Sequence, residues 1–144
     1  MGRVGQRTAP AVLVVALSPL LAACTQVEDS ESDYSPTKVT AIPGRQEQQV
    51  TFNAEAVRRA GLRTAHVRRR DGRSFIPYAA LIYAANGDTF TYVSHRPRVY
   101  VREPIRVDHI AAGRVVLRRG PPVGTVVVTT GAAEVYSAEF GVEE

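Results

Sequence analysis

The sequence predicts a mainly β protein: a small antiparallel β-sheet or barrel domain with one or two short helices, after a cleaved signal and a flexible tether. Short runs rich in valine, isoleucine, threonine and tyrosine follow one another from Gln48 onward, separated by turns that contain glycine or proline. No long helical pattern lies between these runs, which argues against an alternating α/β fold. An apolar segment near the N-terminus predicts the signal.

Residues 1–23 have the pattern of a lipoprotein signal peptide. Arg3 and Arg7 give a basic start, and a mostly apolar run follows from Ala9 to Leu21. A membrane-spanning helix needs about 20 apolar residues, so this run is too short. The segment Leu21-Ala22-Ala23-Cys24 resembles the lipobox of bacterial lipoproteins, which implies that the Cys24 thiol receives a diacylglycerol and that the signal is cut just before it. The alternatives are a helix with a buried cysteine, or a plain signal without lipid.

Lipidation of Cys24 would fix where the protein works. Two acyl chains give stable anchoring, so we expect an exported chain held by membrane lipid on the outer face of the cytoplasmic membrane, or on the periplasmic side of a membrane. Cys24 is the only cysteine, which excludes an internal disulfide. Residues 24–49 are polar and turn-rich and have no apolar period, so they predict a flexible tether. Its acidic residues cluster near the start: Glu28, Asp29, Glu31 and Asp33.

Residues 50–144 are expected to form the β domain. Its first strand is QQVTF, which begins at Gln48, just before this boundary. The segment NAEAVRRAG predicts a short helix, with Asn53 as its N-cap and Gly61 as its stop. The alternation in LRTAHV predicts a strand. Arg68–Arg70 with Asp71-Gly72 predict a charged loop.

The second half of the domain is dense in strand signals. YAALIYA and TFTYV predict two strands that are joined by a hairpin turn at Asn86-Gly87. RVYVREPIRV, residues 98–107, alternates as one strand, and Pro104 places that strand at an edge or introduces a bulge because proline has no N–H. GRVVLRRG and TVVVTTG predict further strands around a PPVG turn, and AAEVYSAEFG predicts a closing helix.

No pattern of catalytic residues is present. The histidines, His66, His95 and His109, are scattered and lack the spacing of a metal site. There is no GxSxG elbow and no glycine-rich phosphate loop. We therefore expect a protein that is not an enzyme and that needs no cofactor or metal.

The net charge of +4 is built almost wholly from arginine, and loss of Arg3 and Arg7 with the signal leaves about +2. The runs Arg68–Arg70 and Arg118-Arg119 are compatible with nucleic-acid binding. An exported protein does not normally meet nucleic acid, however, and no aromatic residues interleave with these arginines. Solvated loop charges are the interpretation we favour. The sharper alternative is contact with anionic headgroups or an acidic partner, at about 1 kcal/mol per charge.

Residues 75–140 resemble the C-terminal, membrane-proximal part of periplasmic adaptor proteins, the membrane fusion proteins of the HlyD and RND-efflux kind. The resemblance is carried by a Pro-x-x-Ala strand at Pro77–Ile82, a Thr-Tyr-Val strand at Thr91–Val93, the Ile105–Val107 pair and the glycine-rich segment Arg119–Glu134. The upstream VTFNAEAVRRAGLRTAHV is similar to the lead-in segment of such adaptors. The departures are that Val67 connects to Phe75 within a few residues, where adaptors insert lipoyl halves and a helical hairpin, and that Gly-Asp is Gly124-Thr125 here.

This resemblance implies a membrane-anchored, non-catalytic accessory lipoprotein of a transmembrane transport or efflux system, with a membrane transporter subunit as its partner. The alternative is a stand-alone envelope lipoprotein that binds a small ligand or a cell-wall polymer. Docking contacts in the family follow surface shape and not a fixed motif, so the sequence assigns neither ligand-binding residues nor an oligomeric state.

Overall fold

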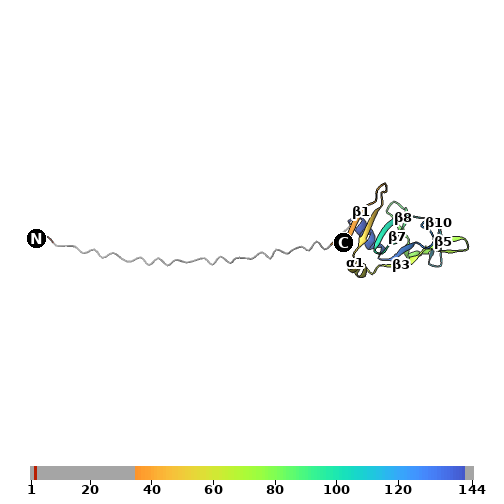
Figure 1. The fold of residues 1–144 in the computed structure, drawn as a ribbon. Helices are drawn as coiled ribbons and strands as arrows, with labels where there is room; N and C mark the ends of the chain where they lie inside the picture. The colour runs from red at the N-terminus through yellow and green to blue at the C-terminus, as the bar shows by residue number, and fades with distance from the viewer. Residues whose placement is uncertain (1, 3–34, 142–144) are drawn as a thin grey trace. The chain divides into compact units, whose positions relative to one another are not determined.

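The computed structural model describes residues 2 and 35–141 (Figure 1). The prediction of a mainly β fold is confirmed, because two antiparallel sheets account for most of these residues and two α-helices accompany them. Residues Asp33–Glu144 form one compact unit, which contains both clusters of buried core residues. The predicted signal peptide, Cys24 and the first part of the predicted tether lie outside the described residues.

The larger sheet has seven strands. Six follow the order β1-β2-β8-β7-β11-β3, and β6 also pairs with β7. Their bounds are β1 (Thr37–Ala41), β2 (Gln48–Phe52), β3 (Arg63–His66), β6 (Ile82–Tyr83), β7 (Thr89–Arg96), β8 (Val99–Pro104) and β11 (Val126–Thr130). The Asn86-Gly87 hairpin is confirmed between β6 and β7: the Asp88 backbone N–H donates to Asn86 Oδ1 at 3.1 Å, and Gly87 has a φ of 85°.

The smaller sheet has four strands in the order β4-β5-β10-β9. Their bounds are β4 (Arg68–Arg70), β5 (Arg73–Pro77), β9 (Arg106–Ala111) and β10 (Arg114–Arg119), and a 3-10 turn η1 (Tyr78–Ala80) follows β5. In Figure 1, β5 and β10 lie at the end of the compact unit that is farther from β1 and α1. The described chain passes between the two sheets four times, after β3, β5, β8 and β10.

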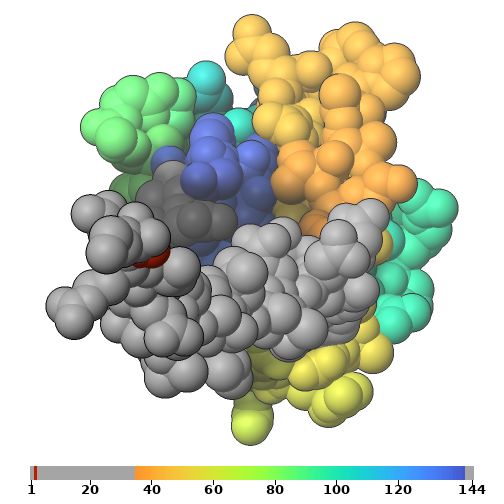
Figure 2. Space-filling view, turned by 90° about the vertical axis from the view of Figure 1, so that its left-hand side faces the viewer, coloured from red at the N-terminus to blue at the C-terminus, as the bar shows by residue number. Residues whose placement is uncertain are grey.

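Both predicted helices are present. Helix α1 (Ala54–Arg59) begins as expected, because Asn53 Oδ1 accepts a hydrogen bond from the Ala56 backbone N–H at 2.8 Å. Helix α2 (Ala132–Phe140) follows Gly131, whose φ of 79° turns the chain from β11 into the helix. Figure 2 shows the face that carries α2, in blue, between the orange β1 segment and the green residues around β6.

The core has two parts, one on each side of the seven-stranded sheet. The part between the two sheets is aliphatic: Val67, Ile76, Ala80, Val93, Val101, Ile105, Val115, Leu117 and Val127. The part between the sheet and the helices holds the buried aromatic residues: Val50, Phe52, Ala56, Phe90, Tyr92, Tyr100, Val128 and Val135. Strand β7 supplies Phe90 and Tyr92 to the second part and Val93 to the first, as the period of two along a strand requires.

Two predictions are wrong, that of a loop at Arg68–Arg70 and that of a single strand over residues 98–107. Arg68–Arg70 form strand β4, which pairs with β5, and the turn is confined to Asp71-Gly72, where φ is 50° and 76°. Residues 98–107 are two strands, because β8 ends at Pro104 and the chain crosses to the smaller sheet at buried Ile105. Strand β8 is also not at an edge, since it lies between β2 and β7. Pro104 is therefore the last residue of β8 before the chain leaves the seven-stranded sheet for the four-stranded one.

Two further boundaries differ from the prediction. The segment YAALIYA begins as the 3-10 turn η1 and contributes only the two-residue strand β6. Strand β1 lies inside the segment that was expected to be tether, and its five residues pair with β2. The pairing partner supplies hydrogen bonds to a polar segment that has no apolar period of its own, which is why the sequence pattern did not indicate it.

Candidate functional site

The two arginine runs of the sequence meet on the four-stranded sheet. Strand β5 lies between β4 and β10, so Arg70 is paired with Arg73, and Arg118 follows the Leu117–Ser74 pair. Because Val115 and Leu117 point into the core, the alternate side chains of β10 point outward. We call the outward arginines of this sheet the arginine face: Arg68, Arg70, Arg73, Arg114 and Arg118.

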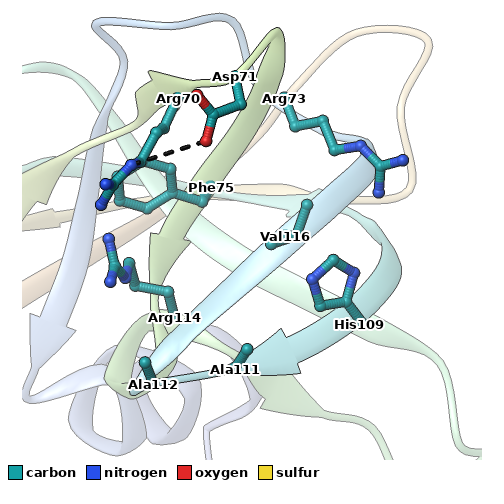
Figure 3. A pocket seen from close by; sticks show the side chains of 9 residues that line it. All are labelled: Arg70, Asp71, Arg73, Phe75, His109, Ala111, Ala112, Arg114 and Val116. Carbon is teal, nitrogen blue, oxygen red and sulfur yellow. Dashed lines mark ion pairs between the residues drawn. The ribbon is translucent and has the colours of Figure 1, made fainter.

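The centre of the arginine face is an apolar strip. Phe75 and Val116 are cross-strand partners, and the Arg114 guanidinium carbon lies 5.4 Å from the centre of the Phe75 ring. This stacking holds the cation over an apolar surface. A shallow pocket of about 320 Å³ lies here; its lining residues are Arg70, Asp71, Arg73, Phe75, His109, Ala111, Ala112, Arg114 and Val116. Figure 3 shows Arg70 and Arg114 on the Phe75 side of the pocket, and Arg73 and His109 beyond Val116.

One carboxylate, Asp108, partly neutralises the arginine face. Its oxygens lie 2.7 Å from Arg73 Nη1, 3.1 Å from Arg118 Nη2 and 3.0 Å from the ring of His109. A bulge between β9 and β10 supplies this carboxylate, because the register skips Asp108 between His109 and Val107. The hydrogen bond with His109, then that with Arg118, and the charge of Arg73 lower the pKa of Asp108, so it is ionised at neutral pH.

The charge of the arginine face is not balanced. The strands of the four-stranded sheet contain eight arginines, and Asp108 is their only acidic residue. A second carboxylate, Asp71, lies in the adjoining turn, 3.7 Å from Arg70 Nε. The side chains of Arg70, Arg73 and Arg118 are 63–72% exposed, so their guanidinium groups are in contact with solvent.

Chemically, such a surface can bind anions. A guanidinium group presents a planar fork of donors that matches a carboxylate or a phosphate. No group of three metal-ligating side chains is found among the described residues. The three histidines lie apart: His66 contacts the Gly124 carbonyl oxygen, His95 contacts Glu103 and His109 contacts Asp108.

A second charged cluster is buried under α2. Glu139 of α2 is 4% exposed, and its Oε2 accepts a hydrogen bond of 2.6 Å from the Tyr92 hydroxyl. Its Oε1 lies 3.3 Å from Nε of Arg102. The Arg102 guanidinium lies between two rings, 5.3 Å from the centre of Phe90 and 5.1 Å from that of Phe140. We call Tyr92, Arg102 and Glu139 the buried triad; it fixes α2 to the seven-stranded sheet.

Burial raises the pKa of Tyr92 well above its ordinary value, and the hydrogen bond and negative charge of Glu139 raise it further. The phenol therefore stays protonated and donates to the carboxylate. Glu139 is the shared partner of the triad: it accepts the hydrogen bond of Tyr92 and forms an ion pair with Arg102, whose buried Nε makes no hydrogen bond within the structure.

Three of the five residues of the arginine face, Arg68, Arg70 and Arg118, belong to the arginine runs that the sequence pattern indicates. Arg73, Arg114 and the carboxylate of Asp108 carried no such signal. The alternation in RVVLRR would have placed Arg114 and Arg118 on one side of a strand. The buried triad left no such signal, because its three residues lie on β7, β8 and α2.

Comparisons with protein-family models, curated proteins and solved structures returned no significant match. Within the described residues, no helix has both the length and the apolar character needed to cross a bilayer.

Proposed function

We propose that the chain is a membrane-anchored, non-catalytic accessory lipoprotein of a transmembrane transport or efflux system, and that the arginine face docks it on an anionic surface at the membrane. The lipobox pattern at Cys24 supports the anchoring, and the resemblance of residues 75–140 to adaptor proteins supports the link to transport. The observation that carries the docking role is the arginine face itself, with five outward arginines and one carboxylate between them.

This role follows from the chemistry of the surface. A solvated guanidinium attracts anions but does not by itself activate a nucleophile or a water molecule. The apolar strip of Phe75 and Val116 adds contact area to the charges. A docking surface therefore accounts for both components of the face, since interfaces commonly combine arginine with aromatic side chains.

Anchoring is tested by metabolic labelling of the full chain with palmitate. The wild type should incorporate the label and Cys24→Ala should not. Labelling of the variant at the wild-type level would contradict the anchoring.

Docking beside a transporter is tested by crosslinking in native membranes, followed by gentle detergent extraction and pull-down of the full chain. A transporter subunit should be recovered with the wild type and lost with Arg73→Glu combined with Arg118→Glu. Arg58→Glu combined with Arg63→Glu changes the net charge equally on α1 and β3, and this control should retain the partner. Recovery of no transporter subunit with the wild type would contradict the link to transport.

The pocket on the arginine face favours one second candidate, a stand-alone envelope lipoprotein that binds a small anionic ligand. A carboxylate or phosphate could contact Arg70 or Arg114 while its apolar portion lies on Phe75. Ligand screening by thermal shift separates this candidate from the first, because a small ligand should stabilise the purified chain without any partner protein.

A further inference from the structure

The arginine face can be assigned a more definite partner than an anionic surface in general. We infer that it binds the anionic phospholipid headgroups of the bilayer to which the chain is tethered. The inference rests on the proposed anchoring at Cys24 and names the surface that the docking face takes.

The first argument is the distribution of charge. From Ser35 onward the chain contains sixteen basic and ten acidic residues, a formal charge of +6, whereas residues 1–34 contain two basic and four acidic residues. Half of those sixteen basic residues are the arginines in the strands of the four-stranded sheet. The positive charge is therefore concentrated at one end of the compact unit (Figure 1).

The second argument is the shape of the surface. The outward arginines come from three neighbouring strands, β4, β5 and β10, which lie about 4.8 Å apart. They thus form an array over a sheet, with the guanidinium groups of Arg70, Arg73 and Arg118 mostly exposed. An array of long, solvated side chains suits a layer of laterally diffusing headgroups, which need no fixed complementary shape.

The third argument is reach. Twelve residues separate Cys24 from Thr37, the first residue of β1. A chain of that length can extend about 40 Å at most. The domain can therefore return to the surface on which its anchor sits. A lipid anchor combined with a basic surface is a stable pair, because each supplies part of the membrane affinity.

One feature opposes binding. Glu28, Asp29 and Glu31 lie between the anchor and the compact unit and carry the same sign as the headgroups. They also offer an alternative partner for the arginine face within the chain. The experiment therefore compares a chain that begins at Thr25 with one that begins at Asp33, the first residue of the compact unit.

The test measures binding of both unacylated chains to vesicles by co-sedimentation. The vesicles contain either phosphatidylcholine alone or phosphatidylcholine with one quarter phosphatidylglycerol. Both chains should bind the phosphatidylglycerol vesicles, should bind phosphatidylcholine at least tenfold more weakly, and should be released as salt rises from about 0.1 M to 1 M.

Variants place the binding on the arginine face. Each arginine near the surface is worth about 1 kcal/mol, or about fivefold in affinity, so Arg73→Gln combined with Arg118→Gln should weaken vesicle binding roughly 25-fold. The control, Arg58→Gln combined with Arg63→Gln, removes the same charge elsewhere and should weaken it less than about threefold. Asp108→Asn should strengthen binding several-fold, because it frees Arg73 and Arg118.

Three results would overturn the inference: equal binding to both vesicle types, equal loss in the two double variants, or binding only by the chain that begins at Asp33, which would assign the face to the tether. These results are distinguishable from failure of the proposed function. If vesicle binding fails but crosslinking still recovers a transporter subunit through the arginine face, the proposed function stands and the lipid inference is wrong. If the chain binds the vesicles and no transporter subunit is recovered, the lipid inference stands and the link to transport is wrong.

Discussion

The protein uses arginine in two opposite ways, in the buried triad and on the arginine face. Arg102 is three-quarters buried, lies between the rings of Phe90 and Phe140 and is paired with Glu139. Arg73 and Arg118 are mostly exposed and share one carboxylate, Asp108. The guanidinium group is the same in both places, but the ratio of positive to negative charge differs.

Because of that difference, substitutions at the two places should affect different properties, stability in the triad and binding on the arginine face. A buried charge must be compensated, because leaving it alone in the interior costs several kcal/mol. An exposed charge is solvated and costs little, so a surplus of one sign can be kept for a partner. Substitutions in the triad should therefore change the free energy of unfolding, whereas those on the arginine face should change binding alone.

The largest effect is expected for Glu139→Ala. It leaves the buried part of Arg102 without its carboxylate and Tyr92 without its acceptor, and should destabilise the domain by about 3 kcal/mol in urea unfolding. Glu134→Gln, on the exposed side of the first turn of α2, should cost less than about 1 kcal/mol. Equal effects of the two substitutions would contradict a structural role for the triad.

Gly131→Ala should cost about 2 kcal/mol. The glycine has a φ of 79°, and an added Cβ would lie 2.3 Å from Leu62 Cδ2 and 3.1 Å from the Ala60 carbonyl oxygen. Gly113→Ala, in the β9–β10 turn beside the arginine face, has a similar φ of 71° with open space around the new Cβ. It should cost only about 1 kcal/mol. The difference in unfolding free energy between the two variants therefore measures the cost of crowding the new Cβ at position 131 against Leu62 and Ala60.

Tyr92→Phe should cost about 1.5 kcal/mol at neutral pH, because Glu139 loses a buried donor. The pKa of Tyr92 is raised in the folded protein, so above pH 10 the unfolded chain loses this proton while the folded protein keeps it. Stability must then fall as pH rises above 10. Tyr92→Phe should lose less stability than the wild type between pH 9 and pH 11. The control is Tyr83→Phe: Tyr83 is 57% exposed, so this variant should behave as the wild type. Burial also raises the pKa of Tyr100, so part of the alkaline loss should remain.

The smallest effect on stability is expected on the arginine face. Arg73→Gln and Arg118→Gln remove exposed ion pairs with Asp108 and should each change the unfolding free energy by less than about 0.5 kcal/mol. Thermal unfolding at low and high salt checks this. A loss above 1.5 kcal/mol for either variant would mean that these arginines hold the sheet together and are not kept for binding.

Much of the fold could be predicted from local patterns. Asn53, Gly61 and Asn86-Gly87 act through their own backbone conformation and their nearest neighbours, so their roles as cap, stop and turn follow from the sequence. Strand β4 could not be predicted in the same way. Three consecutive arginines have no apolar period, and they form a strand only because β5 offers a partner.

The candidate site was predicted only in part for the same reason. Arg68–Arg70 and Arg118 are separated by about fifty residues, and only the position of β5 between their strands brings them onto one face. The crossing of the chain after Pro104 was not predicted for the opposite reason: a local pattern was present, but it was continuous across two separate strands. The apolar alternation continues through Ile105 and Val107, so the pattern looks like one strand even though its two halves belong to different sheets.

Strand β1 has a mechanical consequence. Any tension applied through the residues before Thr37 enters the domain at this strand, which lies at the edge of the seven-stranded sheet and pairs only with β2. Four of its five side chains are exposed, so few core contacts resist its separation. Under load, β1 should peel away from β2 one backbone pair at a time, which would lengthen the segment before it while the core between the sheets stays intact. In the proposed tethered arrangement, the strand would act as a short extensible segment between the anchored end of the chain and the rest of the domain.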